Sequence, residues 1–122
     1  MQEPRAGRLA ERTVDYGLAV MEYCESLPRT AAGRHVGDQL LRSATSVAAN
    51  YAEAESTADF VHKMKVAMKE LKESRAWLIF ASRLAPCEAV ESLRAESREL
   101  LLMVGKSINT ASARMQGKTI GA

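Results

Sequence analysis

Polar and charged residues recur along the predicted second helix at spacings that place them on one flank. Ser43 and Asn50 fall within its otherwise apolar seam, because residues three or four apart share a helix face. A buried polar group without a partner costs roughly 1–3 kcal/mol, so these side chains need hydrogen bonds. We predict a polar network between the second and third helices, made of Arg42, Ser43, Ser46, Asn50, Glu53, Glu70 and Glu73.

Within this network we expect Arg42 to pair with Glu70 or Glu73. Such a network fixes the register of the helices and the geometry of an oligomer more than it adds stability. The sequence leaves two other interpretations open. Arg42 and Glu53 could simply face water, or the polar residues could form a ligand site.

Basic residues follow one flank of the predicted third helix. Ammonium groups one helical turn apart can bind a polyphosphate backbone without reading its sequence. The alternative is an ordinary solvated helix face. We therefore predict a nucleic-acid-binding row that consists of Lys65, Lys69, Lys72, Arg75 and Arg83.

Two aromatic residues, Trp77 and Phe80, lie on the opposite flank of the same helix, beside Glu73. Trp is frequent at protein interfaces because it buries a large rigid surface. We predict that the pair contributes to an oligomer interface, with a place in the core as the alternative. A base-stacking role is disfavoured because the rings share a face with acidic residues.

Metal and cofactor chemistry finds little support in the sequence. Helical bundles with two metal ions use paired Glu-x-x-His motifs, and the chain has none. The nearest pattern is Asp59-x-x-His62, which occurs once, at a predicted helix start. We expect neither a metal nor a cofactor.

Catalytic motifs are equally scarce. The run Gly105–Ser107 looks like the end of a phosphate-binding loop, but position 100 is Leu where that loop needs Gly. Cys24 and Cys87 form no CxxC motif and no disulfide framework, so we expect two reduced thiols. The sequence indicates a protein that is not an enzyme.

Composition and helix signals favour an all-α fold in one domain. Hydrophobic residues make up 47% of the 122, aromatics only 5%, and no alternating strand pattern or hairpin turn appears. Pro28 and Pro86 interrupt the helical periodicity, and Ser56 offers an N-cap. We predict an antiparallel up-down-up-down four-helix bundle that forms homo-oligomers, with helices at about 7–27, 32–54, 57–84 and 87–115 and a loose tail at 116–122.

Charge is unevenly distributed along the chain, although the net charge is only +2. Residues 1–61 hold six Lys/Arg and nine Asp/Glu, a net of −3, and residues 62–122 carry a net of +5. No run approaches the 18 apolar residues of a membrane span, and residues 1–12 lack the apolar core of a signal peptide. We therefore expect a cytoplasmic protein with no membrane contact.

Two runs resemble a known bacterial family: RSATSVAANYAEA at 42–54 and FVHKMKVAMKELKESRAWL at 60–78. They are similar to the four helix bundle proteins, also called 23S rRNA intervening-sequence proteins or S23 ribosomal proteins. The chain also resembles the accessory variability proteins of diversity-generating retroelements. These resemblances imply a cytosolic homopentamer that binds structured RNA or DNA, and a possible protein partner such as a reverse transcriptase.

The function we predict is a non-enzymatic, oligomeric binding or scaffold protein for structured RNA, of the 23S rRNA intervening-sequence type. The alternative is a structural or protein–protein interaction module without nucleic-acid binding. Salt-dependent binding of RNA separates the two.

Overall fold

The structure is a computed structural model that describes residues 5–52 and 56–121. These residues form four α-helices and no strand. Helix α1 spans Arg5–Cys24, α2 Ala31–Ala52, α3 Thr57–Leu84 and α4 Glu88–Gly121. The all-α fold that the composition predicts is therefore confirmed.

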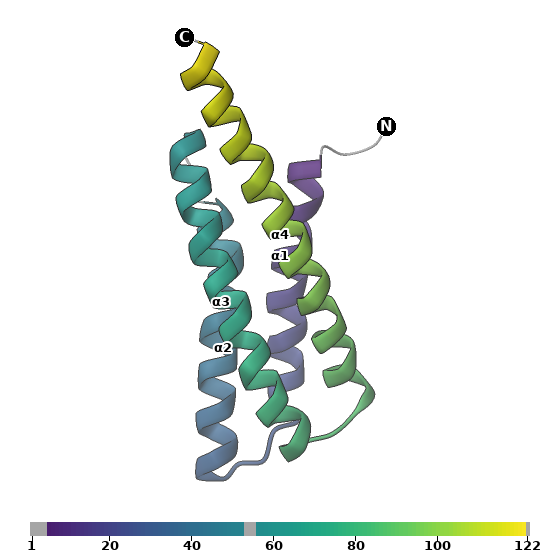
Figure 1. The fold of residues 1–122 in the computed structure, drawn as a ribbon. Helices are drawn as coiled ribbons and strands as arrows, with labels where there is room; N and C mark the ends of the chain where they lie inside the picture. Colours follow the sequence, from purple (N-terminus) through teal and green to yellow (C-terminus); the bar gives the residue numbers. More distant parts are fainter. Residues whose placement is uncertain (1–4, 53–55, 122) are drawn as a thin grey trace.

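The four helices stand side by side, and successive helices run in opposite directions along the chain (Figure 1). Each helix packs against its neighbours in sequence, and α1 also packs against α4. The order around the bundle is thus α1, α2, α3, α4, with α1 diagonal to α3. Helix α4 is the longest, and its C-terminal end projects beyond the other helices (Figure 1).

Two helix ends differ from those predicted. Helix α1 ends at Cys24, because the amides of residues 25–27 bond to carbonyls three residues back, in a tight last turn. The loose tail is wrong for residues 116–121, which continue α4. Gly117 lowers helix stability by about 1 kcal/mol relative to Ala but does not interrupt the hydrogen bonding. Residues 53 and 54, the predicted end of the second helix, lie outside the described residues.

The connection into α2 depends on one glycine. Thr30 caps this helix, since its Oγ1 accepts a hydrogen bond from the Gly33 amide at 3.1 Å. A Cβ at Gly33 would lie 1.9 Å from the carbonyl oxygen of Pro28. Only glycine therefore lets the chain pass Pro28 and begin α2 in this geometry.

The core combines apolar rows from all four helices with a layer of small hydroxyl residues. Each helix gives one fully buried hydroxyl residue, and the four are Thr13, Ser43, Ser74 and Ser97. Each donates to a backbone carbonyl of the preceding turn, so none is left unsatisfied. The Tyr16 hydroxyl also hydrogen-bonds to Ser74 Oγ at 2.8 Å, which joins α1 to α3 through the middle of the bundle.

Candidate functional site

An ion-pair cluster joins α2 to α3 at Arg42. Its Nη1 lies 3.4 Å from Glu70 Oε2, and its Nη2 donates to Glu73 Oε1. The hydrogen bond from Arg42 lowers the pKa of Glu73, and the same contact raises the pKa of Arg42. The structure therefore brings together the charged centre of the predicted network.

The remaining members of that network do not reach across the helix interface. Ser43, Ser46 and Asn50 donate to the carbonyls of Gln39, Arg42 and Ser46, one turn earlier in α2. The prediction of a wide inter-helix network is wrong for these three donors, because polar side chains can bond to their own helix backbone. Glu53 lies outside the described residues.

A second cluster of the same composition joins α1 to α4, and sequence reasoning missed it. Arg12 donates through Nη2 to Glu96 Oε1 and, at 2.7 Å, to Glu99 Oε2. Its Nη1 lies 3.1 Å from Met103 Sδ. These pairs raise the pKa of Arg12, with the Glu96 hydrogen bond as the largest cause. The available signal was the repeated Glu-x-x-Glu spacing, which matches that of Glu70 and Glu73.

The two clusters determine where four carboxylates of α3 and α4 lie. Glu70 and Glu73 of α3 point toward α2, and Glu96 and Glu99 of α4 point toward α1. The opposite flanks of these helices meet at Met68 and Gly105, since a Cβ at Gly105 would be 3.3 Å from Met68 Cε. The α3–α4 surface therefore lies away from all four of these acids.

Basic residues occupy that α3–α4 surface. Lys65 lies three residues before Met68, and Lys72 and Arg75 lie four and seven residues after it, so all three share its side of the helix. Lys69 is the residue directly after Met68. On α4, Arg94 and Arg98 are exposed and lie on the same flank as Gly105. We call the six residues the α3–α4 basic surface: Lys65, Lys69, Lys72, Arg75, Arg94 and Arg98.

Most of these cations are available to a ligand. Arg94 pairs with Glu91 on its own helix at 3.2 Å. The other five form no ion pair within the described part of the chain. Arg94 and Arg98 were not predicted, because they lie on a different helix from the predicted row. Only the packing of α4 on α3 shows that both sets of cations belong to one surface. The predicted Arg83 is exposed but lies two turns beyond Arg75, next to Phe80.

The predicted aromatic pair lies on the α2 side of α3. The Trp77 ring packs edge-on against His35 of α2 at a centroid distance of 5.4 Å, and the Phe80 ring lies 5.5 Å from Trp77. Phe80 is 59% exposed. The alternative of a core position is thus wrong for Phe80, while Trp77 is partly buried against the core.

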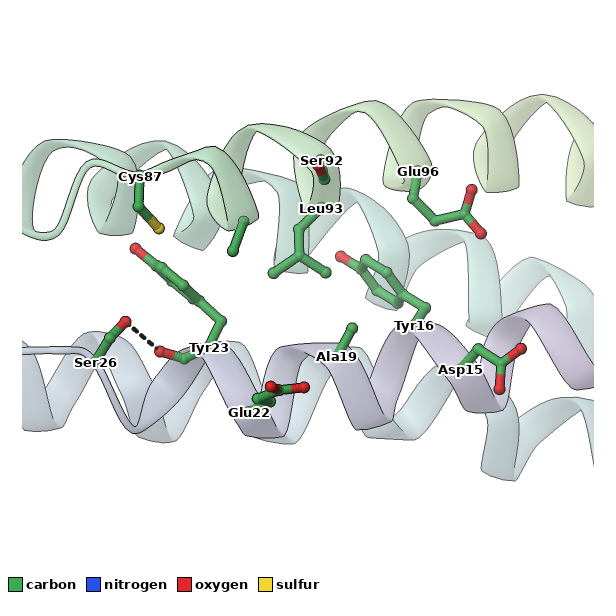
Figure 2. A pocket seen from close by; sticks show the side chains of 11 residues that line it. Asp15, Tyr16, Ala19, Glu22, Tyr23, Ser26, Cys87, Ser92, Leu93 and Glu96 are labelled. Carbon is green, nitrogen blue, oxygen red and sulfur yellow. Dashed lines mark hydrogen bonds between the residues drawn. The ribbon is translucent and has the colours of Figure 1, made fainter.

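A groove of about 590 Å³ opens between α1 and α4 (Figure 2). Tyr16, Tyr23 and Leu93 supply its apolar surface, and Asp15 and Glu22 lie on its α1 side. Burial raises the pKa of both tyrosines to about 12, so they stay protonated at neutral pH. The lining contains neither a histidine nor a basic residue.

Two further searches of the described residues concern metal-binding groups and membrane-spanning helices. In 5–52 and 56–121, no three His, Cys, Asp or Glu side chains lie close enough to hold a metal ion. None of the four helices, over its described length, is apolar enough to cross a bilayer.

Comparisons with known proteins agree with this architecture. A crystal structure at 1.70 Å of a protein with unknown function from the S23 ribosomal protein family of Bacteroides thetaiotaomicron VPI-5482 is similar to this chain, with a TM-score of 0.73 and 28% identity. The match covers 82% of this chain and 97% of that one. No curated protein matches the sequence. The model of the family described as 23S rRNA-intervening sequence protein matches residues 8–106. Because that match spans most of the 122 residues, the chain belongs to the 23S rRNA-intervening sequence protein family.

Proposed function

We propose that this protein is a non-enzymatic, self-associating scaffold that holds structured RNA on the α3–α4 basic surface. The observation that carries the proposal is the separation of charge around α3 and α4. Glu70 and Glu73 bind Arg42, and Glu96 and Glu99 bind Arg12, so these four acids point away from the shared surface. Of the six cations there, only Arg94 pairs with an acid among the described residues, Glu91 of its own helix, and the surface stays basic. The net charge of +2 conceals this local excess.

The dimensions of the surface suit a phosphate backbone. From Lys65 to Arg75 the row on α3 extends about 15 Å, and a packed neighbouring helix lies about 8–10 Å away. Two such rows offer cations to several phosphates at once. Contacts of this kind are independent of base sequence and weaken steeply with salt. The family description, which refers to 23S rRNA, supports RNA as the ligand.

Self-association is the second part of the proposal. Val14, Leu18 and Met21 on α1 are about half exposed, and so is Phe80 on α3. Exposed apolar residues in rows on a small protein indicate a protein contact. We expect a cytoplasmic homopentamer, as the family resemblance implies, in which several copies of a weak RNA-binding surface act together.

The same apolar rows favour the alternative function, a protein–protein interaction module without nucleic-acid binding. In that case the rows hold a partner protein, such as a reverse transcriptase, and the basic surface is an ordinary solvated face. The test below separates these two functions.

The test is fluorescence anisotropy with a labelled structured RNA, titrated at low and at physiological salt. The test variant is Lys65/Lys69/Lys72→Ala, with Arg94/Arg98→Ala as a second one. The control variant, Arg29/Arg34/Arg114→Ala, removes three exposed cations elsewhere. We expect salt-dependent binding that both test variants lose and the control keeps. Equal weakening in test and control would indicate bulk charge only, and absence of binding at low salt would favour the alternative function.

A further inference from the structure

The groove between α1 and α4 is open because short side chains face each other across it. One row of lining positions on α1 is spaced four, three and four, and consists of Asp15, Ala19, Glu22 and Ser26. This row shares one helix face and extends for about 16 Å. On α4 the lining includes Ala89 and Ser92. Side chains this short do not fill the space between the two helices, and a volume of about 590 Å³ remains (Figure 2).

The floor of the groove is carbon surface. Tyr16, Tyr23 and Leu93 supply it, and all three residues are almost completely buried. The two hydroxyl groups already have partners inside the bundle. That of Tyr16 hydrogen-bonds to Ser74 Oγ at 2.8 Å, and that of Tyr23 donates to the Ala81 carbonyl at 3.0 Å. The rings therefore offer the groove their carbon atoms rather than a hydrogen-bonding group.

Two acidic residues on the α1 edge of the groove have no cationic partner. Asp15 and Glu22 are exposed and form no ion pair within residues 5–52 and 56–121. They are seven residues apart, which puts them on the same side of α1 with about 10 Å between them along the helix axis. Glu96, on the opposite edge, is bound by Arg12. The α1 edge therefore carries two free carboxylates separated by two helical turns.

From this arrangement we infer that the α1–α4 groove binds a linear aliphatic polyamine of the length of spermidine. Its two terminal ammonium groups pair with Asp15 and Glu22, and the methylene chain between them lies over Tyr16 and Ala19. An extended chain of about nine single bonds separates the terminal nitrogens by about 11 Å, which matches the spacing of the two carboxylates. The inference does not depend on RNA binding, because the groove and the α3–α4 basic surface lie on opposite flanks of α4.

Each part of such a ligand has a suitable contact in the groove. The methylene groups cover apolar surface as the stem of a Lys side chain does, while the ammonium groups stay at the solvated edge. Ammonium groups are also attracted by the faces of tyrosine rings. The groove, at about 590 Å³, falls within the range of about 300–1,000 Å³ that is typical of small-molecule sites.

The same features disfavour other classes of small ligand. Carboxylates and phosphates are repelled, because the lining holds acidic residues and no basic one. A single metal ion cannot use both acids, since oxygen ligands lie about 2.0–2.6 Å from Mg²⁺ or Ca²⁺ and the two residues are two helical turns apart. A neutral apolar molecule leaves both carboxylates unpaired. A chain with two separated positive charges satisfies the acids and the apolar floor together.

The test is isothermal titration calorimetry of the RNA-free protein with spermidine and with three simpler amines. Diaminooctane has the terminal spacing of spermidine with two charges, putrescine has two charges at about half that spacing, and octylamine has the long chain with a single charge. We expect one spermidine to bind per chain, more weakly as the salt concentration rises. Diaminooctane should bind more tightly than putrescine or octylamine, because only its two charges reach both carboxylates.

Charge-matched variants locate the site. Asp15→Asn/Glu22→Gln removes both carboxylates, and the control Glu25→Gln/Asp38→Asn removes two exposed acids that do not line the groove. Ala19→Leu keeps the acids and fills the floor between them, at an exposed helix position that accepts Leu readily. We expect each neutralised carboxylate to weaken spermidine binding about two- to fivefold. Ala19→Leu should weaken it as well, and the control should leave it unchanged.

The contrary outcomes are distinct. Absence of spermidine binding at low salt would overturn the inference, and equal weakening in the test and control double variants would show attraction by bulk charge only. Full binding by Ala19→Leu would mean that amines pair with the acids outside the groove. Binding of a lysine-rich peptide that depends on Asp15 and Glu22, without binding of spermidine, would assign the groove to a protein segment instead. Each of these results leaves RNA binding by the α3–α4 basic surface untouched.

Discussion

The Tyr16 hydroxyl on α1 lies 2.8 Å from Ser74 Oγ on α3, in the fully buried middle of the bundle. This hydrogen bond connects two helices that are not neighbours. Ser74 also donates to the Leu71 carbonyl, so it keeps a partner if the tyrosine hydroxyl is removed. We therefore expect Tyr16→Phe to lower the free energy of unfolding by about 1 kcal/mol, measured by urea denaturation. Ser74→Ala removes the other partner of this hydrogen bond. If the losses in free energy of unfolding from Tyr16→Phe and Ser74→Ala simply add in the double variant, the two residues do not interact.

Alkaline pH should destabilise the fold through Tyr16 and Tyr23. Burial raises the pKa of each from 10.0 to about 12, so the folded state holds the proton more tightly than the unfolded state. Their contribution is complete below pH 10 and falls as the pH rises from 10 to 12. Urea denaturation between pH 8 and 11.5 should show this decline, and Tyr16→Phe should make it shallower. If stability falls equally steeply with pH in Tyr16→Phe, the decline comes from other titrating groups.

The Arg42 cluster should stabilise the fold at neutral pH and lose its effect in acid. Because Arg42 lowers the pKa of Glu73, the contribution is present above the usual glutamate range and disappears as the pH falls through the lowered value. We expect Arg42→Ala to lower the melting temperature at pH 7 but not at pH 2.5. A variant that keeps both its melting temperature and its oligomer size at pH 7 would remove any structural role for the cluster.

Two glycines should respond to alanine in opposite directions. A Cβ at Gly33 meets the Pro28 backbone, which cannot move aside without displacing the start of α2, so Gly33→Ala should destabilise by about 1–3 kcal/mol. Gly117 has open space around it inside α4, and Gly117→Ala should stabilise by up to about 1 kcal/mol. Thermal unfolding should show a lower melting temperature for Gly33→Ala and a higher one for Gly117→Ala. An unchanged melting temperature of Gly33→Ala would contradict the geometry of the turn between Pro28 and α2.

The two thiols should differ in reactivity. Burial raises the pKa of Cys24 to about 11, and its Sγ faces the Gly37 carbonyl, whereas Cys87 is exposed. Since the thiolate is the reactive form, a thiol reagent at pH 8 should label Cys87 at once and Cys24 only on unfolding. The fast phase of labelling should therefore come from Cys87, and Cys87→Ser should remove it. Two fast phases in the native protein would mean that Cys24 is more accessible than the structure shows.

Local signals in the sequence predicted the fold well. Helix α3 begins and ends where predicted, because Ser56 Oγ accepts from the Asp59 amide at 3.1 Å and Pro86 follows its last residue closely. The ion pair of Arg42 was also predicted, since its partners lie on the next helix. Arg12 was missed because its partners are more than 80 residues away. Ser43, Ser46 and Asn50 were misjudged because carbonyls one turn earlier competed for their donors.

The contact of Tyr23 with the Ala81 and Ala85 carbonyls has a consequence for the dynamics of the bundle. It ties the last turn of α1 to the C-terminal end of α3 at one end of the molecule, while the C-terminal turns of α4 project past their neighbours at the other (Figure 1). Local opening is easiest where few buried contacts must break. Backbone amides should therefore exchange with solvent fastest in the last turns of α4 and slowest near Tyr23, so that the bundle opens progressively from one end.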